Sequence, residues 1–276
     1  FLDGAMGTLL QKKGLKAGEC PELWNIDKPE NIIDVHLQYI KAGVDIINTN
    51  TFGANRIKLK EYKLEGRLEE INRAAVLAAK QARKISGKKV FISGSIGPTG
   101  EFLKPMGNLS FEEMFEVYSE QVKALAGAGA DVINFETMVD LGELRAAVLA
   151  AKSVCSLPVF ANLTFTESGR TLTGSDPLSA FNTLEGIGAD FVGTNCGLGP
   201  NDIAKLIQGI NRHIGAKIVI QANAGIPKLI DGKTVFTCSC HDYVNQLEAI
   251  VSEGVNIIGG CCGTTPEYIQ EVIARF

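Results

Sequence analysis

Short apolar segments and longer amphipathic segments alternate along the whole chain. Segments such as 68–85 and 111–126 carry apolar residues three and four positions apart, the spacing of an amphipathic helix. The short segments are rich in β-branched residues and have the pattern of buried strands. They are spaced mostly about 25 to 45 residues apart, enough for a strand, a crossover helix and two loops. The eight predicted strands lie at 1–3, 44–49, 90–95, 132–136, 159–164, 191–195, 218–222 and 255–259.

The predicted helix ends carry their own signals. Ser110 followed by Glu113 matches a capping box at a helix start. One recurring sequence phrase is typical of a helix that ends at a left-handed glycine. A short loop then leads into a buried parallel strand. The phrase occurs as KAGVDII (41–47), GAGADVI (127–133), GIGADFV (186–192) and SEGVNII (252–258).

Eight strand–helix units without a Pro/Ser-rich linker or a run of charge predict one domain, a (β/α)8 TIM barrel over residues 1–276. A doubly wound α/β sheet is the alternative, but it requires a glycine-rich phosphate turn after the first strand. The segment AMGTLL (5–10) does not match that turn. In a barrel the chemistry lies at the carboxyl ends of the strands, so those residues are the ones to examine.

Composition narrows the class of partner. The chain of 276 residues has a net charge of −4 without a basic stripe, which disfavours nucleic acid and anionic membranes and favours a small molecule or another protein. No apolar run reaches the ~18 residues of a membrane span. Seven cysteines cannot all pair, which indicates a cytoplasmic chain with reactive or metal-binding thiols. The chain begins at Phe1 without an initiator methionine, so we expect it to be excised from a longer multidomain chain.

Three cysteines lie at predicted strand ends. Cys196 follows the 191–195 strand, and Cys261 and Cys262 follow the 255–259 strand inside GGCCG. A single cysteine commonly fills space in a core, but an adjacent pair with a third at the same rim is better explained by metal binding. The surrounding glycines allow the backbone to bend so that both members of the pair reach one ion. Three sulfur ligands and one open position are typical of a catalytic zinc site, with one zinc per chain.

The other cysteines form weaker candidates. Cys238, Cys240 and His241 stand together in CSCH, but this spacing has no matching second pair, and the sequence leaves their roles open. Cys20 and Cys155 lie away from the strand ends and are interpreted as structural.

No motif for hydrolysis is present. The sequence contains no HExxH, GxSxG or P-loop. His36 and His213 have no partner at ligand spacing, so we expect them at the surface or the core edge. None of the predicted strand ends carries a lysine for Schiff-base chemistry.

The ligand set of the predicted zinc site indicates its reaction. Three thiolates leave the ion a poor Lewis acid toward water and suited to a fourth soft ligand. A substrate thiol in that position ionises at neutral pH and still attacks an alkyl group. The site therefore predicts thiol alkylation.

Two carboxylates and one turn at the same rim suit an amino-acid thiol. Glu136 and Asp3 end predicted strands and could bind an ammonium group, although Asp3 could instead cap a turn and Glu136 could pair with a neighbouring loop. The turn after Asp3 exposes backbone N–H groups that could bind a carboxylate. Its residues are Gly4, Ala5, Met6, Gly7 and Thr8.

Three asparagines also lie at predicted strand ends. Asn50 and Asn162 are polar rim residues that could equally tie loops together. Asn223 ends the strand between the two cysteine strands and is a candidate to reach the zinc when no substrate is bound.

Taken together, LDGAMGT (2–8), TNTFGANRIKL (49–59), Glu136, GTNCG (193–197) and GGCCGT (259–264) resemble the homocysteine S-methyltransferase family over the whole chain. The resemblance implies a (β/α)8 barrel with zinc on Cys196, Cys261 and Cys262, homocysteine as substrate and methionine as product. It implies that Glu136 and Asp3 contact the amino group and that amides of the 4–8 turn bind the carboxylate.

Within the family, CPELWNIDKPE (20–30) and TNTFGANRIKL are most similar to the homocysteine module of cobalamin-dependent methionine synthase. That similarity implies methylcobalamin as the donor, carried on a cobalamin-binding module and recharged by a folate-binding module. A free-standing enzyme that uses betaine or S-methylmethionine is the alternative, and a fusion to a folate reductase is another. From a different class, the chain could be a non-catalytic barrel whose cysteines sense zinc or redox state.

Overall fold

The computed structural model describes residues 1–230 and 233–276. Strands and helices alternate through it, as the hydrophobic pattern predicts. The strands are β1 (Ile46–Asn48), β2 (Phe91–Ile96), β3 (Val132–Met138), β4 (Val159–Leu163), β5 (Phe191–Asn195), β6 (Lys217–Ala222), β7 (Pro227–Ile230), β8 (Lys233–Phe236) and β9 (Ile257–Gly260). The helices are α1 (Met6–Lys12), α2 (Trp24–Asp27), α3 (Pro29–Ala42), α4 (Arg56–Lys60), α5 (Leu68–Ser86), α6 (Phe111–Ala128), α7 (Leu141–Val154), α8 (Pro177–Gly186), α9 (Pro200–Ile207), α10 (Cys240–Ser252) and α11 (Pro266–Arg275), with short 3-10 turns at Pro21–Leu23, Glu65–Arg67 and Ile210–Arg212.

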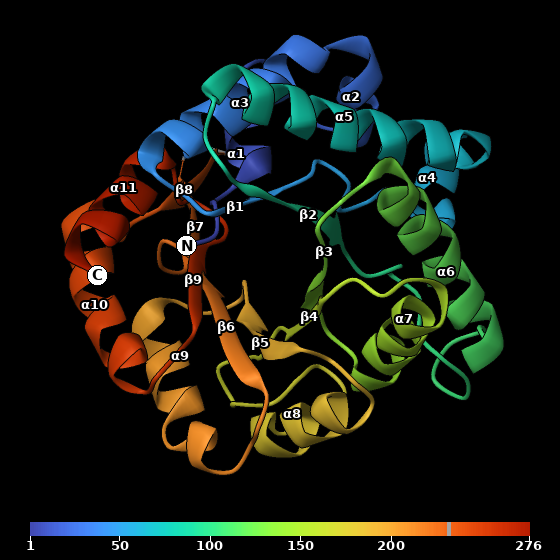
Figure 1. The fold of residues 1–276 in the computed structure, drawn as a ribbon. Helices are drawn as coiled ribbons and strands as arrows, with labels where there is room; N and C mark the ends of the chain where they lie inside the picture. The colour runs from blue at the N-terminus through green and yellow to red at the C-terminus, as the bar shows by residue number, and fades with distance from the viewer. Residues whose placement is uncertain (231–232) are drawn as a thin grey trace.

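Within the described residues, seven parallel strands form one curled sheet in the order β1-β2-β3-β4-β5-β6-β9. Figure 1 shows these strands arranged around a common axis with the helices outside them. The strand order follows the chain without reversing, whereas a doubly wound sheet reverses at a switch point. The doubly wound alternative is therefore wrong. The carboxyl ends of all seven strands face the same side, as parallel pairing requires.

The N-terminal segment lies between the two edge strands of this sheet. The Leu2 amide donates to the Ile258 carbonyl of β9 (2.9 Å), and the Asp3 amide donates to the Ile46 carbonyl of β1 (3.1 Å). Only one residue pair, Leu2 with Ile46, has the pairing of a parallel bridge. The predicted first strand is thus present as a bridge rather than as a full strand.

Glycine closes the helices ahead of the strands as predicted. Gly43 and Gly129 are the left-handed C-caps of α3 and α6. Gly188 and Gly254 have φ of 98° and 77°, and each lies two residues beyond the end of its helix, α8 or α10. The capping box of α6 is also confirmed, because Ser110 accepts from the Glu113 amide and Glu113 accepts from the Ser110 amide.

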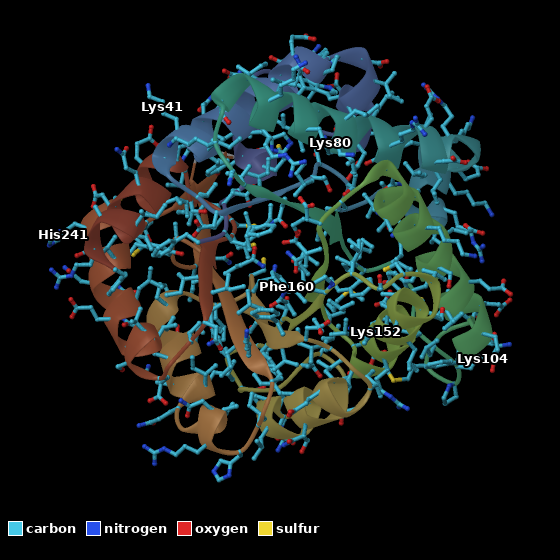
Figure 2. The ribbon with its side chains drawn as sticks, in the orientation of Figure 1. Lys41, Lys80, Lys104, Lys152, Phe160 and His241 are labelled. Atoms are coloured by element: carbon cyan, nitrogen blue, oxygen red, sulfur yellow. The ribbon has the colours of Figure 1, made fainter. Side chains whose placement is uncertain are left out.

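The space enclosed by the sheet is apolar at one end and polar above it. A cluster of buried side chains inside the strands fills the amino-terminal end; Figure 2 labels one member, Phe160, near the middle of the ring. The cluster comprises Leu2, Ile46, Val132, Phe160 and Val219, with Phe191 and Ile257 packed against it. Two residues further along β1, β3 and β4 come Asn48, Asn134 and Asn162, all at least nine-tenths buried. Because side chains alternate along a strand, these asparagines point to the same interior as the apolar cluster.

A hairpin interrupts the seventh predicted strand–helix unit. β7 and β8 pair antiparallel, with Pro227 opposite Phe236, between β6 and α10. The sequence pattern does not predict it, because the repeat has one strand in each unit. Within the described residues, no helix is both long and apolar enough to cross a bilayer.

Two histidines, His36 and His213, are expected at the surface or the core edge, and this prediction is wrong for one of them. His213 is exposed as expected, but His36 is fully buried in α3. Neither ring nitrogen of His36 has a hydrogen-bond partner among the described residues. Burial lowers the pKa of His36 to about 4, so the imidazole is neutral in the folded chain at neutral pH.

This burial predicts an acid-sensitive stability. Because the pKa of His36 is lower in the folded chain than its unfolded value near 6.5, only the unfolded chain takes up a proton as the pH falls from about 6.5 to 4. The contribution of neutral His36 to the free energy of unfolding is therefore complete above pH 6.5. It falls by up to about 3 kcal/mol as the pH decreases toward 4. His36→Leu should lose this acid sensitivity, measured as the free energy of urea unfolding at pH 7.5 and pH 5.

His213→Gln is the matched control and should follow the parent chain at both pH values, because His213 is exposed. Equal acid sensitivity in the parent and in His36→Leu would contradict this assignment.

Candidate functional site: a three-cysteine cluster at the strand ends

The structure brings the three predicted rim cysteines together. Cys196 directly follows β5, and Cys261 and Cys262 directly follow β9. Their sulfur atoms all lie within 4.8 Å of one another, and the Cys196 and Cys262 Sγ atoms are 3.8 Å apart. Strand β6 lies between β5 and β9 and accepts hydrogen bonds from both cysteine segments. The Cys196 amide donates to the Gln221 carbonyl (3.2 Å), and the Cys261 amide donates to the Ala222 carbonyl (2.8 Å).

The backbone bends at Cys196 itself to aim its side chain at the cluster. Cys196 has φ of 60° and Gly197 has φ of 68°, so two successive residues are left-handed. This conformation is uncommon and costly for a residue with a side chain, and it is found most often at functional sites. On the other side of the cluster, Gly263 has φ of 83°, and a Cβ there would overlap the ring of Phe236.

The sulfur geometry fits a tetrahedral zinc ion. Zinc–sulfur bonds of about 2.3 Å at tetrahedral angles place two ligand sulfurs roughly 3.8 Å apart. The Cys196 and Cys262 sulfurs have that separation. Three soft ligands leave one of four positions for a further ligand, which is the arrangement of catalytic zinc.

The pKa values of the three thiols also favour a bound cation. Hydrogen bonds from Cys261 and Cys262 lower the pKa of Cys196 to about 3. Donation to that thiolate raises the pKa of Cys262 to about 12 and raises the pKa of Cys261 as well. The protein atoms therefore stabilise one thiolate, and ionisation of all three thiols requires a cation.

The remaining cysteines do not form a second cluster. The Cys238 sulfur accepts from Gln246 (3.8 Å), and the Cys240 thiol donates to the Glu267 carbonyl (3.7 Å). Figure 2 shows His241 at the outer edge of the molecule, pointing away from it. Over residues 1–230 and 233–276, the three rim cysteines are the one such group of potential metal ligands. Cys20, buried beside Glu22, and Cys155, at the end of α7, also lie away from it.

Glu136 lies in β3 close to the cysteine cluster. The strand continues past it to Met138, with an irregular register between Phe135 and Met138. The Ser95 hydroxyl donates a short hydrogen bond to one carboxylate oxygen, and Asn195 donates to the other (3.4 Å). Burial raises the pKa of Glu136 to about 7, and the hydrogen bond from Ser95 opposes that rise. An ion pair with a neighbouring loop, the structural alternative for Glu136, is not observed among the described residues.

Asp3 is almost completely buried, with 2 % of its surface exposed. Its two carboxylate oxygens accept from Asn48, one from the backbone amide (2.8 Å) and one from the side chain (2.9 Å). Burial raises the pKa of Asp3, the Asn48 amide opposes the rise, and the nearby charge of Glu136 adds to it. The two predicted carboxylates are therefore close enough to interact.

The turn after Asp3 leads directly into α1. Gly4 packs so closely against Tyr39 that a Cβ would lie 2.9 Å from the tyrosine hydroxyl. The Ala5 amide donates to the Thr264 carbonyl (3.4 Å), so it is not free for a ligand. Met6, Gly7 and Thr8 form the first turn of α1, where backbone amides have no partner within the helix.

Asparagine side chains contact the cluster on two sides. Asn223, after β6, is buried, and its side chain helps to lower the pKa of the Cys196 thiol. The Oδ1 atom of Asn223 has no partner in the described part of the chain. Asn195 was missed by the sequence reasoning: its amide nitrogen lies 3.8 Å from the Cys261 sulfur, and its Oδ1 accepts from the Thr137 amide (2.6 Å). Its place directly before Cys196, with a side chain on the interior face of β5, was the available signal.

Two further predicted asparagines serve other purposes. Asn50 ties loops together, since it donates to the Pro21 carbonyl (2.8 Å) and to Asn25 (3.1 Å). Asn162 points into the interior and donates to Asn134 (2.8 Å).

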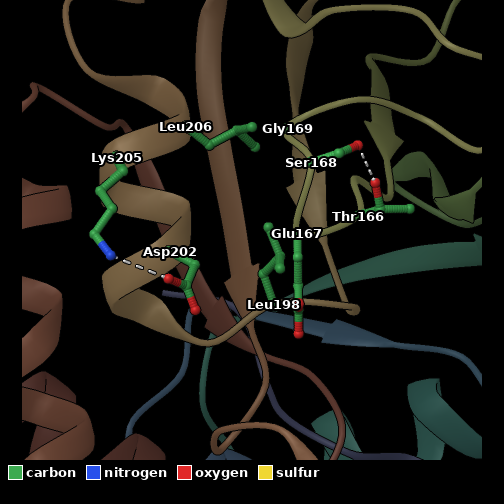
Figure 3. Close-up of a pocket in the computed structure, with 8 residues that line it drawn as sticks. All are labelled: Thr166, Glu167, Ser168, Gly169, Leu198, Asp202, Lys205 and Leu206. Carbon is green, nitrogen blue, oxygen red and sulfur yellow. Dashed lines mark hydrogen bonds and ion pairs between the residues drawn. The ribbon is translucent and has the colours of Figure 1, made fainter.

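A cavity of about 530 Å³ opens near the cluster, between the loop after β4 and helix α9. Figure 3 shows its lining, in which Lys205 pairs with Asp202 (3.3 Å) and Thr166 bonds Ser168 (2.8 Å). Leu198, two residues after Cys196, forms part of its wall. The cavity is next to the cysteine rim and does not contain the cysteines.

The structure of this chain is similar to known methyltransferases. The metallated form of the homocysteine methyltransferase MmuM from Escherichia coli superposes with a TM-score of 0.83 at 24% identity, covering 100% of this chain and 95% of that one. The oxidized form of the same protein gives a TM-score of 0.84, also at 24% identity and with the same coverage. At this identity the likeness establishes a shared fold.

Sequence comparison extends over the whole chain. The methionine synthase of Mycobacterium tuberculosis (strain ATCC 25618 / H37Rv) is 32% identical over 287 residues, and that of Mycobacterium leprae (strain TN) is 31% identical. Each match covers 99% of this chain, which spans about a quarter (24%) of the length of these relatives. The family model for homocysteine S-methyltransferase matches residues 1–276. The chain therefore belongs to the homocysteine S-methyltransferase family.

Proposed function

We propose that this chain binds homocysteine beside a zinc ion held by Cys196, Cys261 and Cys262 and activates its thiol for methylation to methionine. The observation that carries the proposal is the cluster of three sulfurs within 4.8 Å of one another at the ends of β5 and β9. Membership of the homocysteine S-methyltransferase family supports homocysteine as the thiol.

Zinc at this site would supply the positive charge that ionises the three cysteines and lowers the pKa of a substrate thiol at the open position. The chain's own residues bind the rest of the substrate. Glu136 and Asp3 bind the ammonium group, and backbone amides in the 4–8 turn bind the carboxylate, with those of Met6, Gly7 and Thr8 free of partners within the helix. In this proposal Asn223 approaches the metal when no substrate is bound, and its effect on the pKa of Cys196 supports that role.

We also propose that residues 1–3 act as the eighth strand of a closed (β/α)8 barrel. Hydrogen bonds from Leu2 to β9 and from Asp3 to β1 support it, together with the donation of the Gly260 amide to the Asp3 carbonyl (2.9 Å). Closure would place the Asp3 side chain at the same rim as Glu136 and the cysteines.

The methyl donor in this proposal is methylcobalamin bound to another module, with a folate-binding module as a further partner. The support is the similarity to methionine synthases that are about four times as long as this chain. In the reaction, the homocysteine sulfur loses its proton and forms a bond to the methyl carbon. The bond between methyl and donor breaks, and its electron pair stays with the donor.

Cys261→Ser should abolish zinc binding and homocysteine binding while the chain stays folded. Loss of one of three ligands should weaken zinc affinity by roughly 100-fold or more, since even outer hydrogen-bond partners of metal ligands cost about 10- to 100-fold. The checks are zinc content by mass spectrometry, about one per chain in the parent, and circular dichroism for the fold. Cys240→Ser is the control and should keep its zinc; the reverse result would assign the metal to the CSCH segment.

Glu136→Gln should weaken homocysteine binding about 10- to 100-fold, because a charge-assisted hydrogen bond to the ammonium group contributes about 1.5–3 kcal/mol. Isothermal titration calorimetry on the zinc-loaded chain measures this. Binding of 4-mercaptobutanoate, which lacks the amino group, should change much less. Equal losses for both ligands would show that Glu136 does not recognise the ammonium.

A donor assay separates the candidate reactions. The zinc-loaded chain is incubated with homocysteine and, separately, with methylcobalamin, betaine or S-methylmethionine, and methionine is quantified. We expect methionine from methylcobalamin. Methionine from betaine or S-methylmethionine instead would identify a free-standing enzyme, and methionine from none of the three would favour a metal-sensing role.

A further inference from the structure

Three buried asparagines form a line of hydrogen bonds that ends at Asp3. Asn162 in β4 donates to Asn134 in β3 (2.8 Å), and Asn134 donates to Asn48 in β1 (3.1 Å). Asn48 then donates its side-chain N–H to the Asp3 carboxylate (2.9 Å). Asn134 and Asn162 are fully buried, and Asn48 is 9 % exposed. The line crosses the interior of the sheet above the apolar cluster and below the cysteine rim.

Both ends of the line fix its direction. The side-chain N–H of Asn162 also donates to the Phe135 carbonyl (3.2 Å), an atom that can only accept, so the amide group of Asn162 cannot be reversed. At the other end, the Asn48 backbone N–H donates to the second oxygen of Asp3 (2.8 Å). Each asparagine between these ends therefore accepts on the Asn162 side and donates on the Asp3 side. The Asp3 carboxylate thus accepts from two N–H donors of Asn48, which favour its charged form against the opposing effects of burial and of the nearby Glu136 charge.

We propose that this asparagine relay, Asn162–Asn134–Asn48, holds the Asp3 carboxylate charged and oriented, and thereby makes the site selective for thiols that carry an ammonium group. Asn134 and Asn162 are positioning residues that act through Asp3 without touching the substrate. The inference rests on the proposed function, because it assumes that Asp3 faces the amino group of homocysteine.

The physical basis is the cost of a buried charge. Asp3 has lost almost all contact with water, and burial favours its neutral form. Hydrogen bonds in a chain polarise one another, so donation from Asn162 strengthens donation from Asn134 and then from Asn48. Gly193 leaves room for the relay because it has no side chain. A Cβ at this position would lie 2.8 Å from Asn162 Oδ1 and would overlap the Val219 carbonyl.

Asn134→Leu tests the proposal, because leucine has the same branched arrangement of side-chain heavy atoms as asparagine and cannot hydrogen-bond. On the zinc-loaded chain, calorimetry should show homocysteine binding weakened about five- to tenfold, while 4-mercaptobutanoate binding and zinc content stay unchanged. Asn162→Leu should give a smaller change in the same direction and is a second test if Asn134→Leu does not fold. Ser93→Ala is the matched control, because Ser93 is equally buried and its hydroxyl has no partner among the described residues.

A double-mutant cycle with Asp3→Asn tests the route of the effect. In the Asp3→Asn background, Asn134→Leu should cause no further loss of homocysteine binding, because the relay no longer ends at a charge. Equal loss of both ligands in Asn134→Leu, or the same loss in both backgrounds, would overturn the relay and leave a packing role. If the parent chain itself binds the two ligands equally, the proposed function fails with it, and that result is distinct from a failure of the variants alone.

Discussion

The hydrogen bonding of β6 to β5 on one side and to the end of β9 on the other fixes the positions of the three rim cysteines. The amides of Cys196 and Cys261 donate to successive carbonyls of β6, and the Ala224 amide returns a hydrogen bond to the Cys262 carbonyl (3.0 Å). Because side chains alternate along a strand, a slip of one residue in either pairing would turn a cysteine away from the cluster. The left-handed backbone at Cys196 adds a cost that the surrounding sheet must offset. The sulfur geometry is thus a property of three strands together.

Acidic groups gather at this rim, and ionisation of one makes ionisation of its neighbours less favourable. The Cys196 thiolate contributes to the raised pKa of Glu136, and Glu136 contributes to the raised pKa of Asp3. Such an arrangement is unfavourable until cations enter it. A metal at the sulfurs and an ammonium at the carboxylates would each relieve a different part of the repulsion, which gives binding of the two a physical reason to be cooperative.

The sequence predicts the repeating part of the fold well and the irregular part poorly. Strand and helix positions follow from hydrophobic periodicity, and left-handed glycines follow from the phrases before the strands. The β7–β8 hairpin has no counterpart in that repeat. His36 is placed wrongly, although the apolar residues three and four positions away, Ile32, Tyr39 and Ile40, mark the buried face of the helix on which it lies. The rim cysteines are predictable because Cys196 and the Cys261–Cys262 pair each come directly after a strand. The roles of Ser95, Asn134 and Asn195 are not, because they depend on the register between strands that are far apart in sequence.

The interior asparagines show how a buried carboxylate can keep its charge available. An arginine or lysine at the position of Asn48 would stabilise Asp3 more strongly, but it would also neutralise it and exclude a second cation. Apolar residues in the same layer would leave the carboxylate without donors and favour its protonated form. Neutral amides avoid both outcomes, since they donate hydrogen bonds to Asp3 and add no net charge. The apolar cluster beneath this layer then supplies the packing, so the polar layer needs to satisfy only its own hydrogen bonds.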